Sequence, residues 1–197
     1  MENKKKLSPY KIALIVLLVA VLGVGVYGTV IGIKATIKDK KEENPTTTTM
    51  PLSVSGAEES FRKGNFSITL TKDFKEKENE AVHANYICDG VEVLVFRETF
   101  EDYPENKNLT IEEFLNSRIA ENGDVNAELA KDSNGLYYAE FLYSGSGRVQ
   151  RYNVYAYKTE DSCWLVYFIY GKRHTDELLP YVEKWASSVE ISESIIF

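Results

Sequence analysis

The stretch Cys163–Gly171, CWLVYFIYG, decides the fold that the sequence predicts. Apolar side chains occupy its odd and even positions alike, and most of them are aromatic or β-branched. Because successive side chains of a strand point to opposite faces, a strand of this composition is buried on both faces. We therefore expect a central strand, in a sheet that other elements cover on each side.

Three further strands precede this stretch and are expected to form a meander with it. They span residues 127–131, 136–144 and 148–159, and the turns between the four strands are SNG, SGSG and EDS. Turns as short as these join antiparallel neighbours. The carboxyl-terminal half of the chain therefore predicts an antiparallel sheet.

A hairpin and one earlier strand extend this sheet toward the amino terminus. Residues 81–88 and 91–100 flank Asp89-Gly90, a dipeptide that readily adopts the positive φ angles of a tight turn. Residues 66–71, FSITLT, alternate between apolar and polar side chains, which predicts the first strand of the domain.

Two segments with helical periodicity interrupt or follow the strands. In TIEEFLNSRIAENG, residues 110–123, Thr110 and Glu113 form a capping box, in which each side chain satisfies a backbone N–H of the other residue. The second segment, residues 175–191, places apolar side chains three and four positions apart and is predicted to dock on the sheet. Because Pro180 lacks an N–H and suits only a first turn, we expect this helix to begin close to Leu178 or to be kinked there.

The order of three strands, a helix, four strands and a helix resembles the Mog1/PsbP-like α/β sandwich family. The resemblance rests on the opening FSITLTKDF, the central helix, the Tyr-rich meander and a closing helix that ends in SSVEI, and it covers residues 65–191. It implies an α+β fold, an antiparallel sheet with helices packed on it. Members of that family include accessory and binding proteins with different partners and no shared catalytic constellation, so the resemblance assigns no site residue.

Residues 12–33 are free of charged side chains and are long enough for a transmembrane helix, because about 20 apolar residues cross a bilayer core. The alternative is a cleaved signal peptide, but its apolar region is usually shorter and ends in a small-x-small site. Within the predicted span Gly25, Gly28 and Gly32 line one face, a pattern that lets two spans approach closely as a homodimer. Glycine is also common in membrane helices without dimerisation.

The flanks of this segment predict its orientation. The lysine count is tied, with Lys4, Lys5, Lys6 and Lys11 on one side and Lys34, Lys38, Lys40 and Lys41 on the other. Acidic residues dilute the second cluster, and everything beyond it is long and polar. We therefore expect a basic cytoplasmic tail at 1–11 and a protein of the cell membrane whose bulk lies outside the cytoplasm.

A linker and a globular domain follow the predicted span. Residues 34–64 combine a charged run with TTTT between two prolines, which predicts a stalk, the alternative being a disordered cytoplasmic linker. We expect the globular domain at 65–191 and a short tail at 192–197.

The charge of the chain is divided unevenly. The chain has 23 basic and 30 acidic residues, of which residues 1–41 contain eight basic and two acidic ones. Residues 42–197 therefore contain 15 basic and 28 acidic residues, a net charge of −13. A protein that binds nucleic acid needs cationic side chains to displace counterions from phosphates. The sequence therefore predicts no nucleic-acid partner.

Residues with catalytic or metal-binding chemistry are few. The histidines are His83 and His174 and the cysteines are Cys88 and Cys163. His83 and Cys88 are an odd number of residues apart on an expected strand and so face opposite sides, and no sequence motif of a hydrolase or a phosphate-binding loop occurs. We predict no catalytic residue, no metal and no cofactor. An extracytoplasmic location permits a Cys88–Cys163 disulfide, although two buried, unpaired thiols are favoured.

One strand suggests a binding surface. In RYNVYAY, Arg151, Asn153, Tyr155 and Tyr157 project to one side. Tyrosine and arginine are enriched where proteins bind partners, which makes this a candidate binding face; the alternative is that a helix covers it. We expect a membrane-anchored, non-catalytic binding or scaffold module whose partner is a protein or an envelope polymer. The alternatives are a regulatory subunit that signals through the span and, disfavoured by the lack of a catalytic motif, a surface enzyme.

Overall fold

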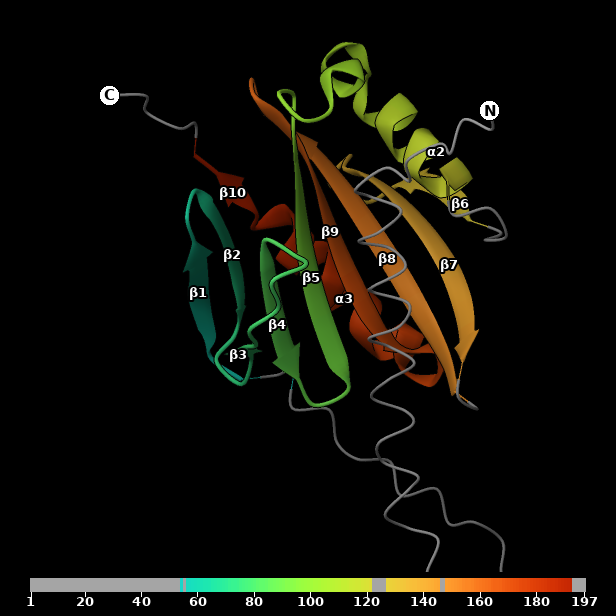
Figure 1. Cartoon of the computed structure of the whole chain (residues 1–197). Coiled ribbons are helices and arrows are strands. Elements are labelled where there is room, and N and C mark those ends of the chain that lie inside the picture. The colour runs from blue at the N-terminus through green and yellow to red at the C-terminus, as the bar shows by residue number, and fades with distance from the viewer. Residues whose placement is uncertain (1–53, 55, 122–126, 146–147, 193–197) are drawn as a thin grey trace, which may run out of the picture. The chain divides into compact units, whose positions relative to one another are not determined.

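The computed structural model describes residues 54, 56–121, 127–145 and 148–192 (Figure 1). The predicted tail at 1–11, the predicted span at 12–33 with its three glycines, and most of the predicted stalk lie outside these ranges. Among the described residues, no helix is both long and apolar enough to cross a membrane. Residues 52–197 form one compact unit.

A seven-stranded antiparallel sheet forms the centre of the unit, in the order β3-β4-β5-β9-β8-β7-β6. Its strands are β3 (Lys75–Glu76), β4 (Ala84–Cys88), β5 (Val91–Thr99), β6 (Glu128–Lys131), β7 (Tyr137–Gly145), β8 (Arg148–Lys158) and β9 (Ser162–Gly171). The predicted meander is confirmed, because β6, β7, β8 and β9 pair in sequence. The predicted hairpin is confirmed as well: Gly90 has φ 78° between β4 and β5.

Strand β9 is the central strand that its sequence predicts. Every residue from Ser162 to Tyr170 is buried, on both faces of the sheet. Its even-numbered residues from Trp164 to Tyr170 belong to the main core, together with Val91, Val93 and Val95 of β5. Apolar burial of this extent is the largest favourable contribution to folding.

A second sheet, of three strands, packs on the same side of the large sheet as that core. It consists of β1 (Glu58–Lys63), β2 (Phe66–Thr71) and β10 (Glu190–Ile191), in the order β1-β2-β10. Phe66 of β2 stacks on Trp164 with ring centroids 5.9 Å apart. Strand β1 corrects the predicted stalk, which includes residues 58–63. Val54, which the predicted stalk also includes, has its side chain buried in the core.

Helix α3 (Thr175–Ser187) covers the same side of the large sheet. Leu178, Val182, Trp185 and Ala186 are buried in the core, as the spacing predicts. The expected start near Leu178 is wrong, because the helix begins at Thr175 and includes Pro180 in its second turn. At that depth the proline removes one intrahelical N–H donor, and the helix nevertheless continues to Ser187 with its apolar stripe buried.

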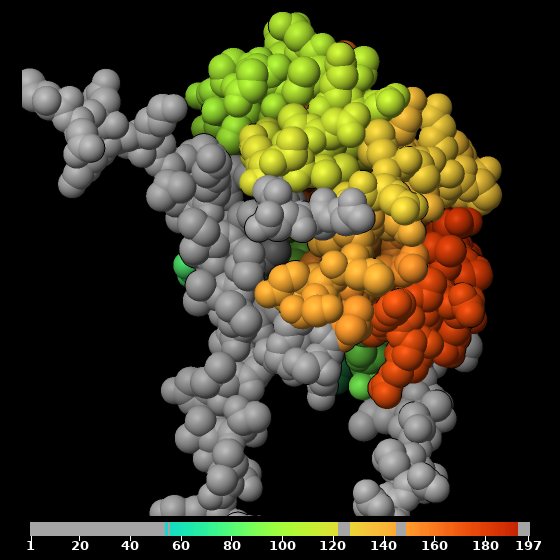
Figure 2. Space-filling model, turned by 90° about the vertical axis from the view of Figure 1, so that its right-hand side faces the viewer, coloured from blue at the N-terminus to red at the C-terminus, as the bar shows by residue number. Residues whose placement is uncertain are grey.

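Helix α2 (Ile111–Glu121) packs on the opposite side of the sheet, against β7 and β8, and follows the short 3-10 helix η1 (Pro104–Asn108). The predicted capping box is confirmed, because Thr110 N–H donates to Glu113 Oε2 at 2.8 Å and Glu113 N–H donates to Thr110 Oγ1 at 3.2 Å. Figure 2 shows the unit from the side, with α2 in yellow-green and α3 in red at different faces. The fold is therefore α+β, with antiparallel sheets and two helices in layers.

Candidate functional site

The predicted binding face on β8 is largely interior. Asn153 and Tyr155 are fully buried, and Tyr157 donates its hydroxyl hydrogen to the backbone oxygen of Ala186 in α3 at 2.8 Å. The interpretation as an open binding face is thus wrong for these residues, and the alternative, that a helix covers this face, is confirmed at Tyr155 and Tyr157, which lie against α3. Alternation along a strand identifies side chains that share a face, but it does not reveal which element covers that face.

Arg151, the fourth residue of that face, lies at the margin of the covered region. Its Nη1 donates to Glu140 Oε2 on β7 at 2.7 Å, and its side chain is 19% exposed. Beside it the Tyr170 hydroxyl donates to Asn153 Oδ1 at 2.7 Å, and burial raises the pKa of Tyr170 to about 12. These contacts join β7, β8 and β9 and are structural in character.

The histidines and cysteines do not come together. The Nε2 atom of His83 lies 3.0 Å from the backbone oxygen of Lys63, and its ring packs edge-on against Trp164. Cys88 and Cys163 are both free. Their partners on β5 are Val91 and Glu98, so they are about 24 Å apart along the sheet, far beyond disulfide distance. Among the described residues, no three side chains of metal-binding type form a group.

The most buried charged cluster was not apparent from the sequence. Glu98 of β5 pairs with Arg118 of α2, and their side chains are 4% and 7% exposed. Asn106 of η1 donates to Glu98 Oε2 at 2.7 Å and accepts from Arg118 Nη2 at 3.0 Å. Burial raises the pKa of Glu98, and Arg118 and Asn106 oppose the rise by hydrogen-bonding to the carboxylate.

Aromatic rings surround the guanidinium of this cluster. It lies 5.0 Å from the ring centroid of Phe114 and 5.9 Å from that of Tyr103, within the range of cation–π attraction. One sequence pattern could have revealed the cluster: Arg118 is four residues after Phe114, on the apolar stripe of α2, where a cation needs a buried partner.

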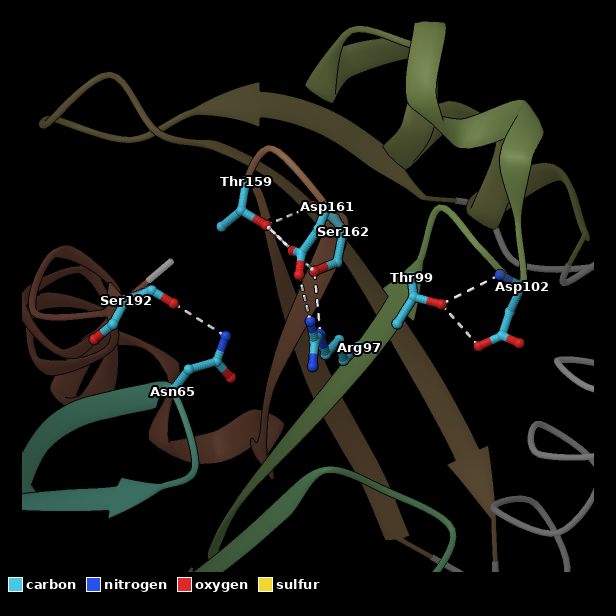
Figure 3. A network of polar contacts seen from close by, with 8 residues as sticks. All are labelled: Asn65, Arg97, Thr99, Asp102, Thr159, Asp161, Ser162 and Ser192. Carbon is cyan, nitrogen blue, oxygen red and sulfur yellow. Dashed lines mark hydrogen bonds and ion pairs between the residues drawn. The ribbon is translucent and has the colours of Figure 1, made fainter. Parts of the chain in front are cut away.

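A polar network occupies the end of the sheet where the β8–β9 turn lies, and we call it the polar edge (Figure 3). It comprises Asn65, Arg97, Thr99, Asp102, Thr159, Asp161, Ser162 and Ser192. Arg97 Nη2 donates to Asp161 Oδ2 at 2.7 Å, and its guanidinium lies 5.2 Å from the ring centroid of Trp164. The hydrogen bond from the Ser162 hydroxyl, with smaller contributions from Thr159 and Arg97, lowers the pKa of Asp161.

Two further contacts complete the polar edge. Thr99 Oγ1 donates to Asp102 Oδ2 at 2.7 Å, and Asn65 Nδ2 donates to the backbone oxygen of Ser192 at 3.1 Å. Carboxylates, hydroxyls and a guanidinium thus lie at one accessible edge, close to Trp164. Trp164 itself is fully buried, so the partly exposed side chains of Arg97 and Asp161 are the groups that can hydrogen-bond to a polar partner here.

A small cleft separates α2 from the sheet, with Leu115, Arg118, Ile119, Ala139, Phe141, Val154 and Tyr167 as its lining. Its volume is about 10 Å³, which a single water molecule fills. Small-molecule ligands and cofactors occupy pockets of several hundred Å³. This cleft is therefore too small for a cofactor in the conformation that the structure describes.

Comparison with known proteins finds no protein-family model and no curated protein that match the chain. Solved structures show partial likeness. The solution structure of a cyanobacterial PsbP from Synechocystis sp. PCC 6803 has a TM-score of 0.47 and 14% identity, over 75% of this chain and 99% of that chain.

Two crystal structures are similar to a comparable extent. One, of a protein from Bacteroides thetaiotaomicron, has a TM-score of 0.45 and 14% identity over 71% of this chain, and the match spans only 49% of that chain. The other is LpqN, involved in cell envelope biogenesis of Mycobacterium tuberculosis, with a TM-score of 0.44 and 8% identity over 70% of this chain and 91% of that chain. A structural similarity at this level assigns neither a family nor a function to the chain.

Proposed function

We propose that the chain is a single-pass membrane protein whose carboxyl-terminal unit is a non-catalytic binding or scaffold module outside the cytoplasm. One observation carries the proposal: a compact unit with its own core, residues 52–197, follows an uncharged apolar segment of span length, residues 12–33. A chain of this order has a membrane anchor, a connection and a folded module.

The polar clusters of the unit favour binding over chemistry. Glu98, Arg118 and Asn106 hydrogen-bond to one another in the interior. The carboxylate of Asp161 accepts hydrogen bonds from Ser162, Thr159 and Arg97. A catalytic carboxylate or nucleophile instead has to face a space that a substrate can enter. In this proposal the polar edge provides the contact surface for a protein or an envelope polymer.

Cysteine labelling tests the anchor and its orientation. In a Cys88→Ser, Cys163→Ala background, Thr47→Cys should react with a membrane-impermeant thiol reagent in intact cells, and Ser8→Cys should not. Both variants should react after permeabilisation, which controls for accessibility. Labelling of Ser8→Cys alone in intact cells would show that the chain has the opposite orientation. Recovery of the chain in the soluble fraction would contradict the proposed membrane anchor.

Self-association through the span is part of the same proposal. Gly25, Gly28 and Gly32 would let two helices approach closely and gain van der Waals contact. Gly28→Ile should then weaken association in a membrane reporter assay. Gly23→Ile, which adds the same side chain on another side of the helix, is the matched control. Equal signals from the two variants would exclude dimerisation through this face.

Photo-crosslinking tests the contact surface. A photoreactive residue in place of Asp102 should capture the partner in intact cells, whereas the same residue in place of Asp89, at the other end of the sheet, should not. Capture at Asp89 alone would place the partner site away from the polar edge. The mobility of the adduct on a gel distinguishes a protein from a polymer.

A further inference from the structure

Strand β1 is the longest edge strand among the described residues. The small sheet ends in β1 and β10, and the large sheet ends in β3 and β6. Strand β1 has six residues, whereas β3 and β10 have two each and β6 has four. In Figure 1, β1 lies at the outer margin of the unit, with β2 on its inner side. Its length and position therefore suit it to pair with a further strand.

The backbone groups of alternate β1 residues point away from β2. Lys72 N–H, directly after β2, donates to Ala57 O at 2.8 Å, so the backbone oxygen of Ala57 points toward that side. Successive residues of an antiparallel strand alternate in the direction of their backbone groups. The N–H and C=O groups of Glu58, Ser60 and Arg62 therefore point outward.

Thr69 of β2 confirms this alternation. It lies opposite Ser60 in the register, and its N–H donates to Ser188 Oγ at 2.9 Å instead of to β1. The described residues contain no hydrogen-bond partner for the outward backbone groups of Glu58, Ser60 and Arg62. These groups are available to a strand from outside the unit.

The charges of β1 are divided between its two ends. Glu58 and Glu59 begin the strand, and Arg62 and Lys63 end it. When a second copy of β1 runs antiparallel to the first, the acidic end of each strand lies beside the basic end of the other. A parallel arrangement would place like charges side by side, which is unfavourable. The strand is thus complementary to itself in one direction only.

The ion pairs that β1 already makes are exposed. Glu58 pairs with Lys184 of α3, and Lys63 pairs with Glu76 of β3. These four side chains are all at least 41% exposed, and ion pairs this accessible contribute little to stability. Arg62 is exposed and has no ion-pair partner among the described residues. The charges of the strand can therefore attract a second copy.

We propose that two copies of the chain associate through β1, with the two strands antiparallel around a two-fold axis. The outward residues then lie opposite one another, with Ser60 facing Ser60 of the second copy and Glu58 facing Arg62. The residues of each pair exchange N–H···O bonds in both directions, and the Glu58–Arg62 pairs add charge attraction. The two small sheets become one continuous sheet, with three strands from each copy. Because the contact uses the β1 edge of both copies, it closes at a dimer.

This contact goes beyond the proposed function and does not depend on the membrane anchor. It involves residues of the compact unit alone and is separate from the predicted association through Gly28 of the span. Residues 42–197 carry a net charge of −13, so long-range repulsion between two copies opposes the contact. We therefore expect a reversible dimer that forms at high concentration of the chain.

Disulfide cross-linking of the full chain tests the register. In the Cys88→Ser, Cys163→Ala background, Ser60→Cys places two thiols opposite each other, with Cα atoms about 5.5 Å apart, a separation that a disulfide spans. Oxidation by copper phenanthroline should yield a covalent dimer. Asp89→Cys, in the exposed β4–β5 turn, is the control for random collision and should give several-fold less dimer. Addition of Gly28→Ile should leave the Ser60→Cys yield unchanged.

A charge swap in the Ser60→Cys chain tests the pairing of Glu58 with Arg62. Arg62→Glu should lower the cross-linked yield several-fold, because it opposes Glu58 of the second copy, and Glu58→Lys should do the same opposite Arg62. Coexpression of these two variants with different tags should restore cross-linking between unlike copies. Glu128→Lys on β6, which changes the net charge as Glu58→Lys does, should leave the yield unchanged.

Melting curves establish that each variant folds. Equal yields from Ser60→Cys and Asp89→Cys overturn the inference, as does a mixture of the swapped variants that cross-links no more than either alone. Such a result would show that the charges of β1 protect the edge from pairing. Loss of the Ser60→Cys dimer with Gly28→Ile would assign association to the span and likewise overturn the inference.

Discussion

Arg118 of α2 and Glu98 of β5 form an ion pair in the interior of the domain, and Asn106 of η1 hydrogen-bonds to both residues. The pair connects a helix on one face of the sheet to the end of a core strand. A buried pair of this kind contributes little relative to apolar residues of the same volume, but loss of one partner leaves an uncompensated buried charge.

The first prediction concerns this pair. Glu98→Leu should lower the free energy of unfolding of residues 52–197 by about 3 kcal/mol, because Arg118 then loses its buried partner and keeps the partly exposed Glu121 as an ion-pair partner. Glu98→Leu with Arg118→Met should recover a large part of that loss. Urea denaturation measures both. Glu76→Gln, which breaks the exposed Lys63–Glu76 pair, is the control and should cost less than about 1 kcal/mol.

A double variant as unstable as Glu98→Leu would contradict this account. It would mean that the loss comes from Asn106, which is 1% exposed and would lack both of its charged partners.

The sequence predicts those parts of the fold whose patterns are local. Burial of β9 follows from its continuous apolar run, the β4–β5 hairpin from Asp89-Gly90, and the start of α2 from Thr110 and Glu113. Strand β1 was missed because its residues, EESFRK, are exposed or half-buried and show no apolar alternation. An edge strand of this kind forms by pairing with β2, a long-range effect that local pattern does not contain.

The candidate sites were harder to predict for the same reason. The alternation in RYNVYAY gives the residues of one face correctly, but α3, which packs against Tyr155 and Tyr157, comes from later in the chain. The polar edge unites Asn65 with Ser192 and Arg97 with Asp161. Pairs so distant in sequence become neighbours only through the order of strands in the sheets.

The second prediction concerns the capping box of α2. Thr110→Ala removes the oxygen that accepts from Glu113 N–H and should lower the free energy of unfolding by about 1 kcal/mol. Urea denaturation monitored by circular dichroism measures the change. Glu112→Gln, in the same turn but outside the box, is the matched control. An equal effect of the two variants would show that the cap contributes no more to stability than one carboxylate in the first turn does.

The third prediction concerns pH and Asp161. Its pKa is lowered in the folded state, chiefly by the Ser162 hydroxyl, so the ionised carboxylate stabilises the fold above the unfolded pKa of about 4. That contribution is lost as pH falls through the folded pKa. Asp161→Asn should therefore be less stable than the parent at neutral pH, and the difference should shrink to zero in strong acid.

Urea denaturation across this pH range measures the difference. Glu160→Gln removes the neighbouring carboxylate, which is exposed, and as the matched control it should change stability at neutral pH far less than Asp161→Asn does. A deficit of Asp161→Asn that persists unchanged below about pH 2 would show that the amide disturbs the β8–β9 turn by its geometry alone.

The last prediction concerns the two thiols, which lie at opposite ends of β5. Burial raises the pKa of Cys163 to about 11 and also raises that of Cys88, which is only half-buried. Because the thiolate is the reactive form, Cys163 should react with a disulfide reagent far more slowly than Cys88 in the folded protein. Cys88→Ser should therefore remove the fast phase and Cys163→Ala the slow one, and urea should make the two rates similar. A single rate in the folded parent, or no reaction until a reductant is added, would contradict the separation of two free cysteines along the sheet.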